Sequence, residues 1–490
     1  MATTIIIVKC KLQSEQQTAR SERSKIESQK DRSIFNLRKN MFKKIRHIHF
    51  VGIGGSGMSG IAEVLATIGY RVSGSDLKKT ETTEHLRKLG AKIYIGHAKK
   101  NIKGADVVVT STAVSRANPE VIAAEISKIP VIPRIEMLAE LARLKYAVTI
   151  AGTHGKTTTT SLASLILQKG GLDPTIVIGG RLKNLKSGAR LGRGEYLVAE
   201  ADESDGSFLK LSPTITVVTN IDNDHLDYYG TLENIKRAFV QHINSVPFYG
   251  CAVLCSDDAN VREILPEMKR RYVTYGLTGK PDYTATAITP LDCGARFQVI
   301  ANGKRKGAIS LRVPGRHNIL NALAAVAVGL ELGIPFARVA EALGEYAGVG
   351  RRLEMKGEKK GVLVIDDYGH HPTEIKATLS AVKGNWPSRK LTVLFQPHRY
   401  SRTAHLYREF AGVFDDADEI QLLDIYPAGE KPVPGVTSQL IYGIMKDRGL
   451  PVEHYKGVDL LAKRVADGDI VLTLGAGDVW KQGEELLKKI

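Results

Sequence analysis

The sequence predicts an α/β protein of three domains, each built around a mostly parallel sheet. The chain has 490 residues, and domains of about 150 residues predict about three of them. Two units of strand, glycine loop and helix follow one another, and strands alternate with helices in the rest of the chain. We expect the domains to span residues 41–143, 144–348 and 349–490.

Residues 1–40 differ from the rest of the chain. They contain neither Gly nor Pro and show little apolar periodicity, which predicts a disordered N-terminal extension. Ordered sequence begins after Met41, and we expect Met41 to be the natural start. The intact mass of the protein from its native host tests this expectation.

The composition narrows the class of protein. Apolar residues make up 43% of the chain and charged residues 25%, as in globular proteins. No uncharged apolar run reaches the roughly 18 residues of a membrane helix, so we expect a cytoplasmic protein without membrane insertion. The cysteines lack the paired spacing of a zinc site and are too sparse for a disulfide framework, so we expect reduced thiols. They are Cys10, Cys251, Cys255 and Cys293.

The net charge of +17 is compatible with binding either nucleic acid or anionic small molecules. The excess is spread along the chain, and no block of Lys and Arg is interleaved with aromatic residues. We therefore expect small anionic substrates and no nucleic acid.

The first block begins with a strand that runs into glycines at residues 45–57. A helix follows over residues 58–70, and a second strand over residues 71–76. Gly52, Gly54 and Gly57 fit the pattern G-x-G-x-x-G, which lets the backbone approach a diphosphate at a helix N-terminus. A tight turn between strand and helix would give the same pattern. Further strands within residues 105–114 and 129–133, and a helix over residues 134–144, complete a Rossmann-like domain.

The second block repeats this plan with the loop "AGTHGKTTTT" at residues 151–160. Only two residues separate Gly152 from Gly155, whereas the usual phosphate loop has four between its glycines. Lys156 can contact terminal phosphates, and the hydroxyl of Thr157 or Thr158 can ligate magnesium. A glycine turn with an incidental lysine is the alternative, but the strand before the loop and the helix after it favour a nucleotide.

Magnesium also needs carboxylates. A strand ending near Glu200 leads into a cluster of acids, and a later strand ends near Asp222, Asp224 and His225. Acids in a loop are often only a solvated surface. Because parallel strands end at one edge of a sheet, we expect these two loops to meet, with Glu200 as a ligand.

A third block starts after helices at residues 318–333 and 336–346. Strands within residues 361–369, 391–401 and 419–427 alternate with helical segments, and a last strand lies near the C-terminus. Polar groups follow these strands, so this edge should face a ligand. They include Asp366, Asp367, Tyr368, His370, His371, His398, Arg399, Arg402, Asp424 and Asp478.

Seven motifs in order carry a family resemblance. They are "GIGGSGMSGIAE", "AGTHGKTTTT", "EADESDGSF", "NIDNDHLDYYG", "PGRHNILNA", "DDYGHHPTE" and "QPHRYSRT". From Met41 onward the chain resembles the Mur ligases, most closely the member that adds L-alanine, and the shortened phosphate loop is the normal form in that family. The resemblance implies a Rossmann-like N-terminal domain, a central P-loop ATPase-like domain with a parallel sheet, and a Rossmann-like C-terminal domain.

The resemblance also implies an activity. ATP would phosphorylate the carboxylate of UDP-N-acetylmuramate, and the amine of L-alanine would attack the acyl phosphate, with magnesium as cofactor. This reaction belongs to cytoplasmic peptidoglycan precursor synthesis, which cell shape and division require. We expect a monomer or homodimer.

The site residues implied by the resemblance fall into four groups. The UDP-sugar diphosphate is expected at Gly54, Gly55, Ser56, Gly57, Ser75 and Asp76. ATP is expected at Gly152, Thr153, His154, Gly155, Lys156, Thr157, Thr158, Asn318, Asn321, Arg352 and Asp367. The metal ligands are expected to be Thr157, Glu200 and His225. The amino-acid and muramyl carboxylates are expected near Tyr368, His370, His371, His398, Arg399 and Arg402. The catalytic residues among these would be Lys156, Glu200, His225, His371 and Arg399.

Several Mur ligases carry a carbamylated lysine that bridges two metals. The corresponding spacing falls on or near Val240, and the nearest lysine, Lys236, is expected on the exposed side of a helix over residues 232–243. We therefore do not predict carbamylation.

Four other functions remain open. A ligase that attaches a preformed peptide to the same UDP-sugar shares the fold and the ATP site. A folate polyglutamylating enzyme would not need the first block. A dehydrogenase would place Asp76 on the ribose of NAD but would leave the loop at Lys156 unexplained. A nucleic-acid-binding protein would show affinity that falls steeply with salt.

Overall fold

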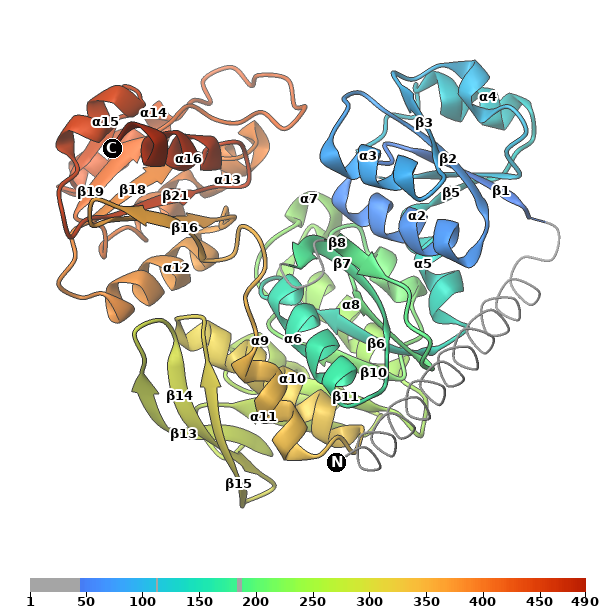
Figure 1. Ribbon diagram of the computed structural model, residues 1–490, viewed down its shortest axis with the longest axis horizontal. Coiled ribbons are helices and arrows are strands. Elements are labelled where there is room, and N and C mark those ends of the chain that lie inside the picture. Colours follow the sequence, from blue (N-terminus) through green and yellow to red (C-terminus); the bar gives the residue numbers. More distant parts are fainter. Residues whose placement is uncertain (1–44, 112, 183–186) are drawn as a thin grey trace, which may run out of the picture. The chain divides into compact units, whose positions relative to one another are not determined.

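The computed structural model describes residues 45–111, 113–182 and 187–490 (Figure 1). The expected extension, Met41 and Cys10 lie outside these residues. The described chain forms two compact units. The first contains the residues up to Ala147 together with Asp173–Gly179 and Gly188–Leu197. The second contains Val148–Leu172, Gly180–Ser187 and Val198–Ile490. The exact boundaries of the three domains stay a prediction.

The first unit holds a parallel sheet of five strands in the order β3-β2-β1-β4-β5. Its strands are β1 (His47–Val51), β2 (Arg71–Asp76), β3 (Lys92–Ile95), β4 (Val107–Thr110) and β5 (Val131–Pro133). Its helices are α2 (Ser56–Ile68), α3 (Glu81–Lys88), η1 (Lys99–Ile102), α4 (Pro119–Ile126) and α5 (Arg134–Ala142). The strand order reverses at β1, so the glycine loop after β1 lies where Rossmann-like sheets bind ligands.

A second sheet has ten strands in the order β15-β14-β13-β12-β11-β10-β6-β9-β7-β8. The first five in chain order are β6 (Tyr146–Ala151), β7 (Thr175–Leu182), β8 (Ser187–Arg190), β9 (Tyr196–Glu200) and β10 (Ile215–Val218). The others are β11 (Cys251–Cys255), β12 (Tyr272–Gly276), β13 (Tyr283–Pro290), β14 (Ala295–Ala301) and β15 (Lys304–Leu311). The strands from β6 through β10, β11 and β12 to β13 pair in parallel.

The strands β13, β14 and β15 form an antiparallel meander that the expectation of a parallel sheet did not include. Asn302 and Gly303 join β14 to β15, and both have positive φ, at 50° and 74°. Two such residues between strands give the tight turn whose twist matches a hairpin. The signal was present in the sequence as an Asn-Gly pair.

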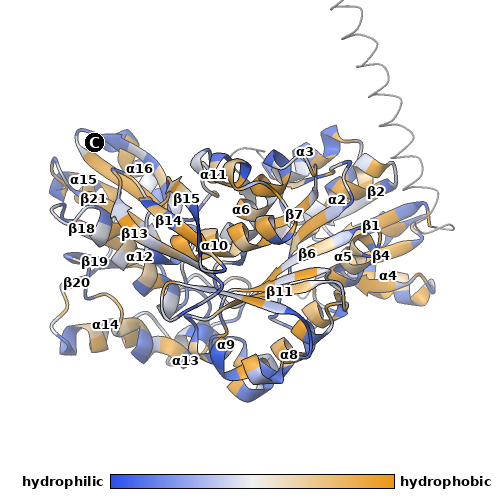
Figure 2. Cartoon of the chain, turned by 90° about the horizontal axis from the view of Figure 1, so that it is seen from below, coloured by the Kyte–Doolittle hydropathy of each residue, from blue (hydrophilic) through white to orange (hydrophobic). Residues whose placement is uncertain are grey.

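Helices cover the ten-stranded sheet. They are α6 (Lys156–Lys169), η2 (Ser207–Lys210), α7 (Leu226–Tyr229), α8 (Leu232–Asn244), α9 (Ala259–Ile264), η3 (Leu265–Glu267), α10 (Arg316–Glu331) and α11 (Phe336–Gly344). Helix α10 packs on α6, and most residues of both are buried. Figure 2 shows β11 as hydrophobic along its length, whereas α8 alternates between polar and apolar residues, as expected of a helix with one face in the core.

The C-terminal sheet has six strands in the order β16-β17-β21-β18-β19-β20. All neighbours pair in parallel except β16, which is antiparallel to β17. Its strands are β16 (Glu354–Lys359), β17 (Val362–Asp367), β18 (Leu391–Phe395), β19 (Glu419–Leu422), β20 (Val452–His454) and β21 (Ile470–Leu474). Its helices are α12 (Pro372–Asn385), α13 (Tyr400–Ala411), α14 (Gln439–Asp447), α15 (Val458–Arg464) and α16 (Trp480–Lys489). The four strands expected in this block are confirmed.

Lys236 corrects one expectation from the sequence. The residue is only 6% exposed, although its helix face was expected to be in solvent. Its ammonium donates to Glu263 at 2.8 Å and to Glu233 at 3.1 Å. The aliphatic stem is buried while the charge reaches carboxylates near the surface, which is why a polar residue can lie on the core side of α8.

The core of the C-terminal sheet gives a stability prediction. Phe395 is fully buried, with its ring centroid 5.0 Å from that of Phe414. We expect Phe395→Ala to lower the free energy of unfolding by about 3–5 kcal/mol, because it leaves a cavity. Urea denaturation followed by tryptophan fluorescence measures this transition selectively, since both tryptophans, Trp386 and Trp480, belong to this part of the chain.

The matched control is Val433→Ala, because Val433 is 42% exposed and lies in the same C-terminal part of the chain. That substitution should change the free energy of unfolding by less than about 0.5 kcal/mol. Equal effects of the two substitutions would contradict the packing described for Phe395.

Candidate active site

The shortened glycine loop connects β6 to α6. Gly152 and Gly155 have positive φ, at 126° and 80°. A Cβ added at Gly152 would overlap Thr219 Oγ1, and one at Gly155 would lie 2.6 Å from Asn321 Oδ1. Among the described residues no side chain caps the first turn of α6, so its N–H groups are available to an anion.

Lys156 lies at the start of α6 with its ammonium folded over the loop. It donates to the carbonyl oxygens of Gly152 at 2.6 Å and Thr153 at 3.1 Å, and to Glu203 Oε1 at 2.9 Å. Burial alone would lower the pKa of Lys156, but Glu203 and Asp202 raise it. The lysine is therefore charged and lies beside the position expected for phosphates.

The loop after β10 fixes the shape of the phosphate loop. Asn220 Oδ1 accepts from the N–H of His154 at 2.8 Å, and Asn220 Nδ2 donates to the carbonyl of His154 at 3.0 Å. Thr219 Oγ1 donates to the same carbonyl at 2.6 Å, and Thr153 Oγ1 accepts from the N–H of Asp222 at 2.9 Å. Thr219 and Asn220 were missed by the sequence analysis, although both directly follow a buried strand.

Two asparagines of α10 extend this network from the other side. Asn321 Nδ2 donates to Asn318 Oδ1 at 3.3 Å, so the two side chains share one helix face as expected. Asn321 Oδ1 also accepts from Thr159 Oγ1 of α6 at 3.1 Å. Both asparagines therefore lie at the phosphate loop, where the sequence analysis expects ATP.

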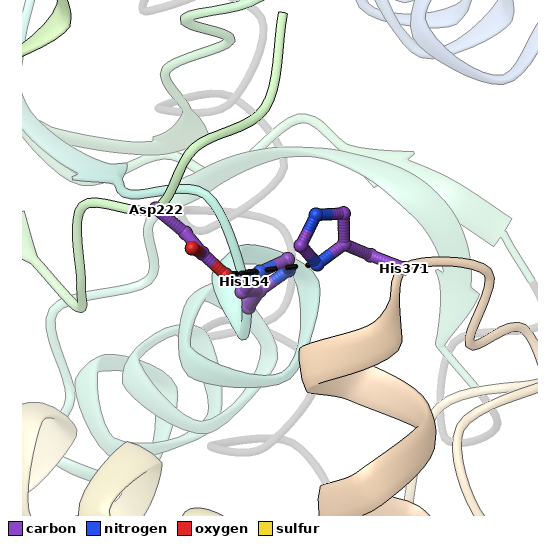
Figure 3. A group of neighbouring side chains, drawn as sticks. All are labelled: His154, Asp222 and His371. Atoms are coloured by element: carbon purple, nitrogen blue, oxygen red, sulfur yellow. Dashed lines mark hydrogen bonds and ion pairs between the residues drawn. The ribbon is translucent and has the colours of Figure 1, made fainter. Parts of the chain in front are cut away.

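His154 lies between Asp222, in the loop after β10, and Glu374, in the first turn of α12. Figure 3 shows His154 and Asp222 with His371, which is the N-cap residue of α12. His154 Nε2 lies 2.9 Å from Asp222 Oδ2, and His371 Nδ1 lies 3.6 Å from the same oxygen. On its other side, His154 Nδ1 lies 3.4 Å from Glu374 Oε1. Burial alone would lower the pKa of His154, but Asp222 and Glu374 raise it to about 9.

Glu374 joins the C-terminal block to the phosphate loop and was missed by the sequence analysis. It lies in the first turn of α12, where it accepts from the N–H of His370 at 3.1 Å. Arg352 Nη1 lies 3.4 Å from its Oε1. An acid three residues after the helix N-cap is a recognisable signal in "HPTE", but its contact with His154 depends on tertiary structure.

Asp367 behaves differently from the other residues expected at ATP. Its carboxylate accepts from the N–H groups of Leu353 at 2.7 Å and Gly369 at 2.8 Å, and from Thr378 Oγ1 at 3.2 Å. Burial raises its pKa to about 6. Asp367 therefore fixes the loops around it in this structure, and its contact with ATP stays a prediction.

The expected metal ligands lie beside Lys156. His225 Nε2 lies 3.8 Å from Glu203 Oε1 and 3.7 Å from Asp224 Oδ2. Glu203 is 2% exposed, and its Oε2 has no hydrogen-bond partner among the described residues. A buried carboxylate oxygen left over in a set of hard oxygen donors fits magnesium. The sequence analysis preferred Glu200 over Glu203 because Glu200 ends the strand.

The sequence left open whether the hydroxyl of Thr157 or that of Thr158 ligates magnesium, and the two side chains differ in exposure. Thr158 is buried and Thr157 is half-buried. Thr157 is therefore the hydroxyl with the better access to a bound metal.

The C-terminal edge brings several expected residues together. The ring centroids of His370 and His398 are 5.8 Å apart, and Arg402 Nη1 lies 3.4 Å from His398 Nδ1. The guanidinium carbon of Arg352 lies over the ring of Tyr368, 5.1 Å from the centroid of that ring. Burial lowers the pKa of His398 to about 4, so this ring is neutral near pH 7. Arg399 is half exposed and lies 4.0 Å from Glu430, and its charge also lowers the pKa of His398.

The glycine loop of the first unit is where the sequence analysis expects a second anion. A Cβ at Gly54 would lie 2.8 Å from Asp76 Oδ2, and one at Gly57 would overlap the guanidinium of Arg134. No side chain among those described caps α2, so its N–H groups are available. Arg134, which the sequence analysis missed, adds a positive charge at this helix end.

Two other predicted residues complete the first unit's loop. Gly55 is the N-cap of α2 and Ser56 is its first residue. Ser75 is fully buried, and its hydroxyl bonds Glu120 at 2.5 Å. Ser75 thus joins the glycine loop to Glu120, because its carbonyl also accepts from the N–H groups of Gly52 and Ile53.

Three domain families match the chain in the expected order. Residues 47–146 match the Mur ligase family, catalytic domain, and residues 150–329 match the Mur ligase middle domain. Residues 351–477 match the Mur ligase, glutamate ligase domain. The chain belongs to the Mur ligase family.

Among this chain's Mur ligase relatives is the UDP-N-acetylmuramate--L-alanine ligase of Endomicrobium trichonymphae. It is 63% identical over 450 residues, which cover 92% of this chain and 100% of the relative. The corresponding ligase of Trichlorobacter lovleyi is 57% identical over 456 residues, covering 92% and 100%. The crystal structure of UDP-N-acetylmuramate-alanine ligase MurC from Thermotoga maritima has a TM-score of 0.77 at 32% identity, covering 90% of this chain and 98% of that one.

In this Mur ligase, the charge on His154 gives a pH prediction. The folded-state pKa of about 9 lies above the ordinary 6.5, so its stabilising contribution is full below pH 6.5 and is lost as pH rises through about 9. Asp222 and Glu374 stay ionised there, because their pKa values are lowered. The stability difference between wild type and His154→Asn should shrink by about 3 kcal/mol between about pH 6 and pH 10.

Urea denaturation at a series of pH values measures this difference. His405→Asn is the control, because His405 is an exposed residue of α13. A difference for His154→Asn that does not change with pH would contradict the ion pairs described here.

Proposed function

We propose that the chain joins L-alanine to the carboxylate of UDP-N-acetylmuramate at the expense of ATP. The observation that carries this proposal is identity of 63% to a UDP-N-acetylmuramate--L-alanine ligase over that relative's whole length. The phosphate loop with a buried, charged Lys156 supports it, because ligation through a phosphorylated carboxylate needs such a site.

The chemistry follows from the reactivity of a carboxylate. An amine does not displace an oxide from a carboxylate, so one oxygen must first become a leaving group. Transfer of the γ-phosphoryl group of ATP to that oxygen gives an acyl phosphate and ADP. The amine of L-alanine then attacks the carbonyl carbon, the bond from carbon to the phosphate oxygen breaks, and the nitrogen loses a proton as phosphate leaves.

The chain's own groups are suited to these steps. Lys156 and the free N–H groups of α6 would offset the charge of the transferring phosphoryl group. His154, held charged between Asp222 and Glu374, adds positive charge at the same loop. The neutral rings of His370 and His398 lie with Arg402 at the carboxyl edge of the C-terminal sheet, where we place the amino acid and the muramyl carboxylate.

Magnesium belongs to this proposal as a cofactor. Thr157, Glu200 and His225 would hold it, with Glu203 as a further oxygen donor, because its buried Oε2 has no other partner among the described residues. When bound, the metal would supply positive charge that offsets the charge on the phosphate oxygens. ATP would also contact Asn318, Asn321, Arg352 and Asp367.

The UDP-sugar would bind at the first unit's glycine loop. The N–H groups of α2 and the nearby Arg134 suit a diphosphate. We further propose that the protein acts in the cytoplasm in peptidoglycan precursor synthesis, as a monomer or homodimer. No helix among the described residues is long and apolar enough to span a membrane.

A peptide-adding ligase is the second candidate. The murein peptide ligase of Psychrobacter arcticus has the same fold, with a TM-score of 0.69 at 24% identity. The two functions differ in the acceptor, which is L-alanine in one case and a preformed peptide in the other.

Phosphate release from ATP tests the proposal directly. With UDP-N-acetylmuramate and magnesium present, we expect release that depends on L-alanine and not on a tripeptide. Lys156→Met should lower kcat/KM by about 100-fold or more, because the charge at the phosphoryl group is lost. Lys169→Met, at the other end of the same helix, should have little effect, because Lys169 is half-buried and pairs with Glu341 and Glu345 instead of the loop. Release only with a tripeptide would move the assignment to the second candidate.

The metal site gives a further prediction. Glu200→Gln should raise the magnesium concentration for half-maximal activity by about ten-fold, because it removes one anionic ligand. Asp205→Asn, in the same acidic loop, should leave it unchanged, since the Asp205 carboxylate instead accepts from the N–H of Ser207. Magnesium titrations of the three proteins measure this, and equal values for all three would exclude Glu200 as a ligand.

A further inference from the structure

A buried carboxylate of the first unit lies outside every group of site residues described above. Glu120 is in the first turn of α4 and is fully buried. Donors from three separate segments converge on it. They are Ser75 Oγ at 2.5 Å, Asn101 Nδ2 at 2.6 Å, the N–H of Ala98 at 3.1 Å and His49 Nε2 at 3.2 Å.

Glu120 thus joins β1, β2 and the segment after β3. Its contact with His49 continues the network, because His49 Nδ1 lies 2.8 Å from Ser73 Oγ, and His47 Nε2 lies 2.7 Å from the same oxygen. Burial alone would raise the pKa of Glu120, but the hydrogen bonds from His49, Ser75, Asn101 and Ala98 lower it to about 2. The carboxylate is therefore ionised at physiological pH.

Glu120 accepts a hydrogen bond from Ser75 at the end of β2, and the glycine loop is hydrogen-bonded to the same strand end. The carbonyl of Ser75 accepts from the N–H groups of Gly52 at 2.8 Å and Ile53 at 3.0 Å. The next residue, Asp76, accepts from the N–H of Gly54 at 2.9 Å. Three consecutive N–H groups of the loop are thus fixed by two residues of β2.

The segment after β3 is tied to the same place. The N–H of Gly96 donates to the carbonyl of Asp76 at 2.8 Å, and His97 Nδ1 lies 2.9 Å from Ser75 Oγ. Glu120 bonds the side chain of Ser75 and the backbone of Ala98 together. The carboxylate of Glu120 therefore bonds to both the end of β2 and the segment that follows β3.

We propose that Glu120 is a positioning residue for UDP-sugar binding, which fixes the glycine loop through Ser75 and Asp76 without touching the ligand. The inference rests on the proposed function. Burying a carboxylate away from solvent destabilises the fold unless hydrogen bonds to it offset the lost hydration. An apolar side chain could fill the same space without that cost. What a carboxylate adds is a single acceptor for donors from three segments, and these segments end at the ligand edge of the sheet.

The substitution Glu120→Gln tests the proposal, because it keeps the shape but replaces an acceptor oxygen with an amide donor. The amide would face donors, which leaves buried hydrogen bonds unmade. We expect the Kd for UDP, measured by calorimetry, and the KM for UDP-N-acetylmuramate to rise about ten-fold or more. The KM for ATP and kcat should stay within about two-fold of wild type, since those steps use the other anion site.

Glu125→Gln is the matched control, because Glu125 lies on the same helix and is exposed. It should leave the Kd for UDP unchanged. If Glu120→Gln does not fold, Asn101→Ala takes its place, because it removes a donor to Glu120 from a residue outside every predicted binding group, and it should raise the Kd for UDP in the same selective way.

Two results would overturn the proposal. One is an unchanged Kd for UDP in folded Glu120→Gln, and the other is a rise in the KM for ATP equal to that for the UDP-sugar. UDP binding does not require ligation. Selective loss of UDP binding in a protein that adds no alanine would therefore support this inference and contradict the proposed function.

Discussion

The hydrogen bonds between the glycine loop after β6 and the residues that follow β10 are the constraint on which the proposed ATP site depends. The side chain of Asn220 forms hydrogen bonds with both the N–H and the carbonyl of His154. Because Gly152 and Gly155 have no side chains, Thr219 can approach the first and Asn321 the second. With the loop fixed in this way, Lys156 opens α6 beside Glu203. Because the loop has two residues fewer between its glycines than the usual form, neighbouring side chains supply the support that a longer loop would give itself.

Burial and neighbouring charges determine which side chains of the site are protonated. Lys156 and His154 remain cationic because each lies against carboxylates that outweigh the cost of desolvation. Burial lowers the pKa values of His370 and His398, and the nearby charge of Arg402 lowers them further. For His370, the contact with Glu374 at 3.4 Å does not offset these two effects. The site therefore combines a cationic phosphate end with a neutral histidine end, which suits transfer of a phosphoryl group followed by attack of an amine.

The two anion loops solve one physical problem in different ways. Each is a glycine loop that leads into a helix without a side-chain cap. In the second unit, asparagine and threonine side chains support the loop. In the first unit, the end of β2 supports it, and the buried carboxylate of Glu120 holds that strand end. Both arrangements keep backbone N–H groups oriented before a ligand arrives.

The sequence by itself determined the chemistry and its approximate location. Glycines before a helix, Lys156 and acids after buried strands are local patterns, and parallel strands bring their ends to one edge. Tertiary structure alone decided which side chains meet: Glu203 pairs with Lys156, Glu374 reaches His154, and Lys236 is buried on α8. These contacts join residues far apart in the chain, and their geometry depends on packing that no local pattern encodes.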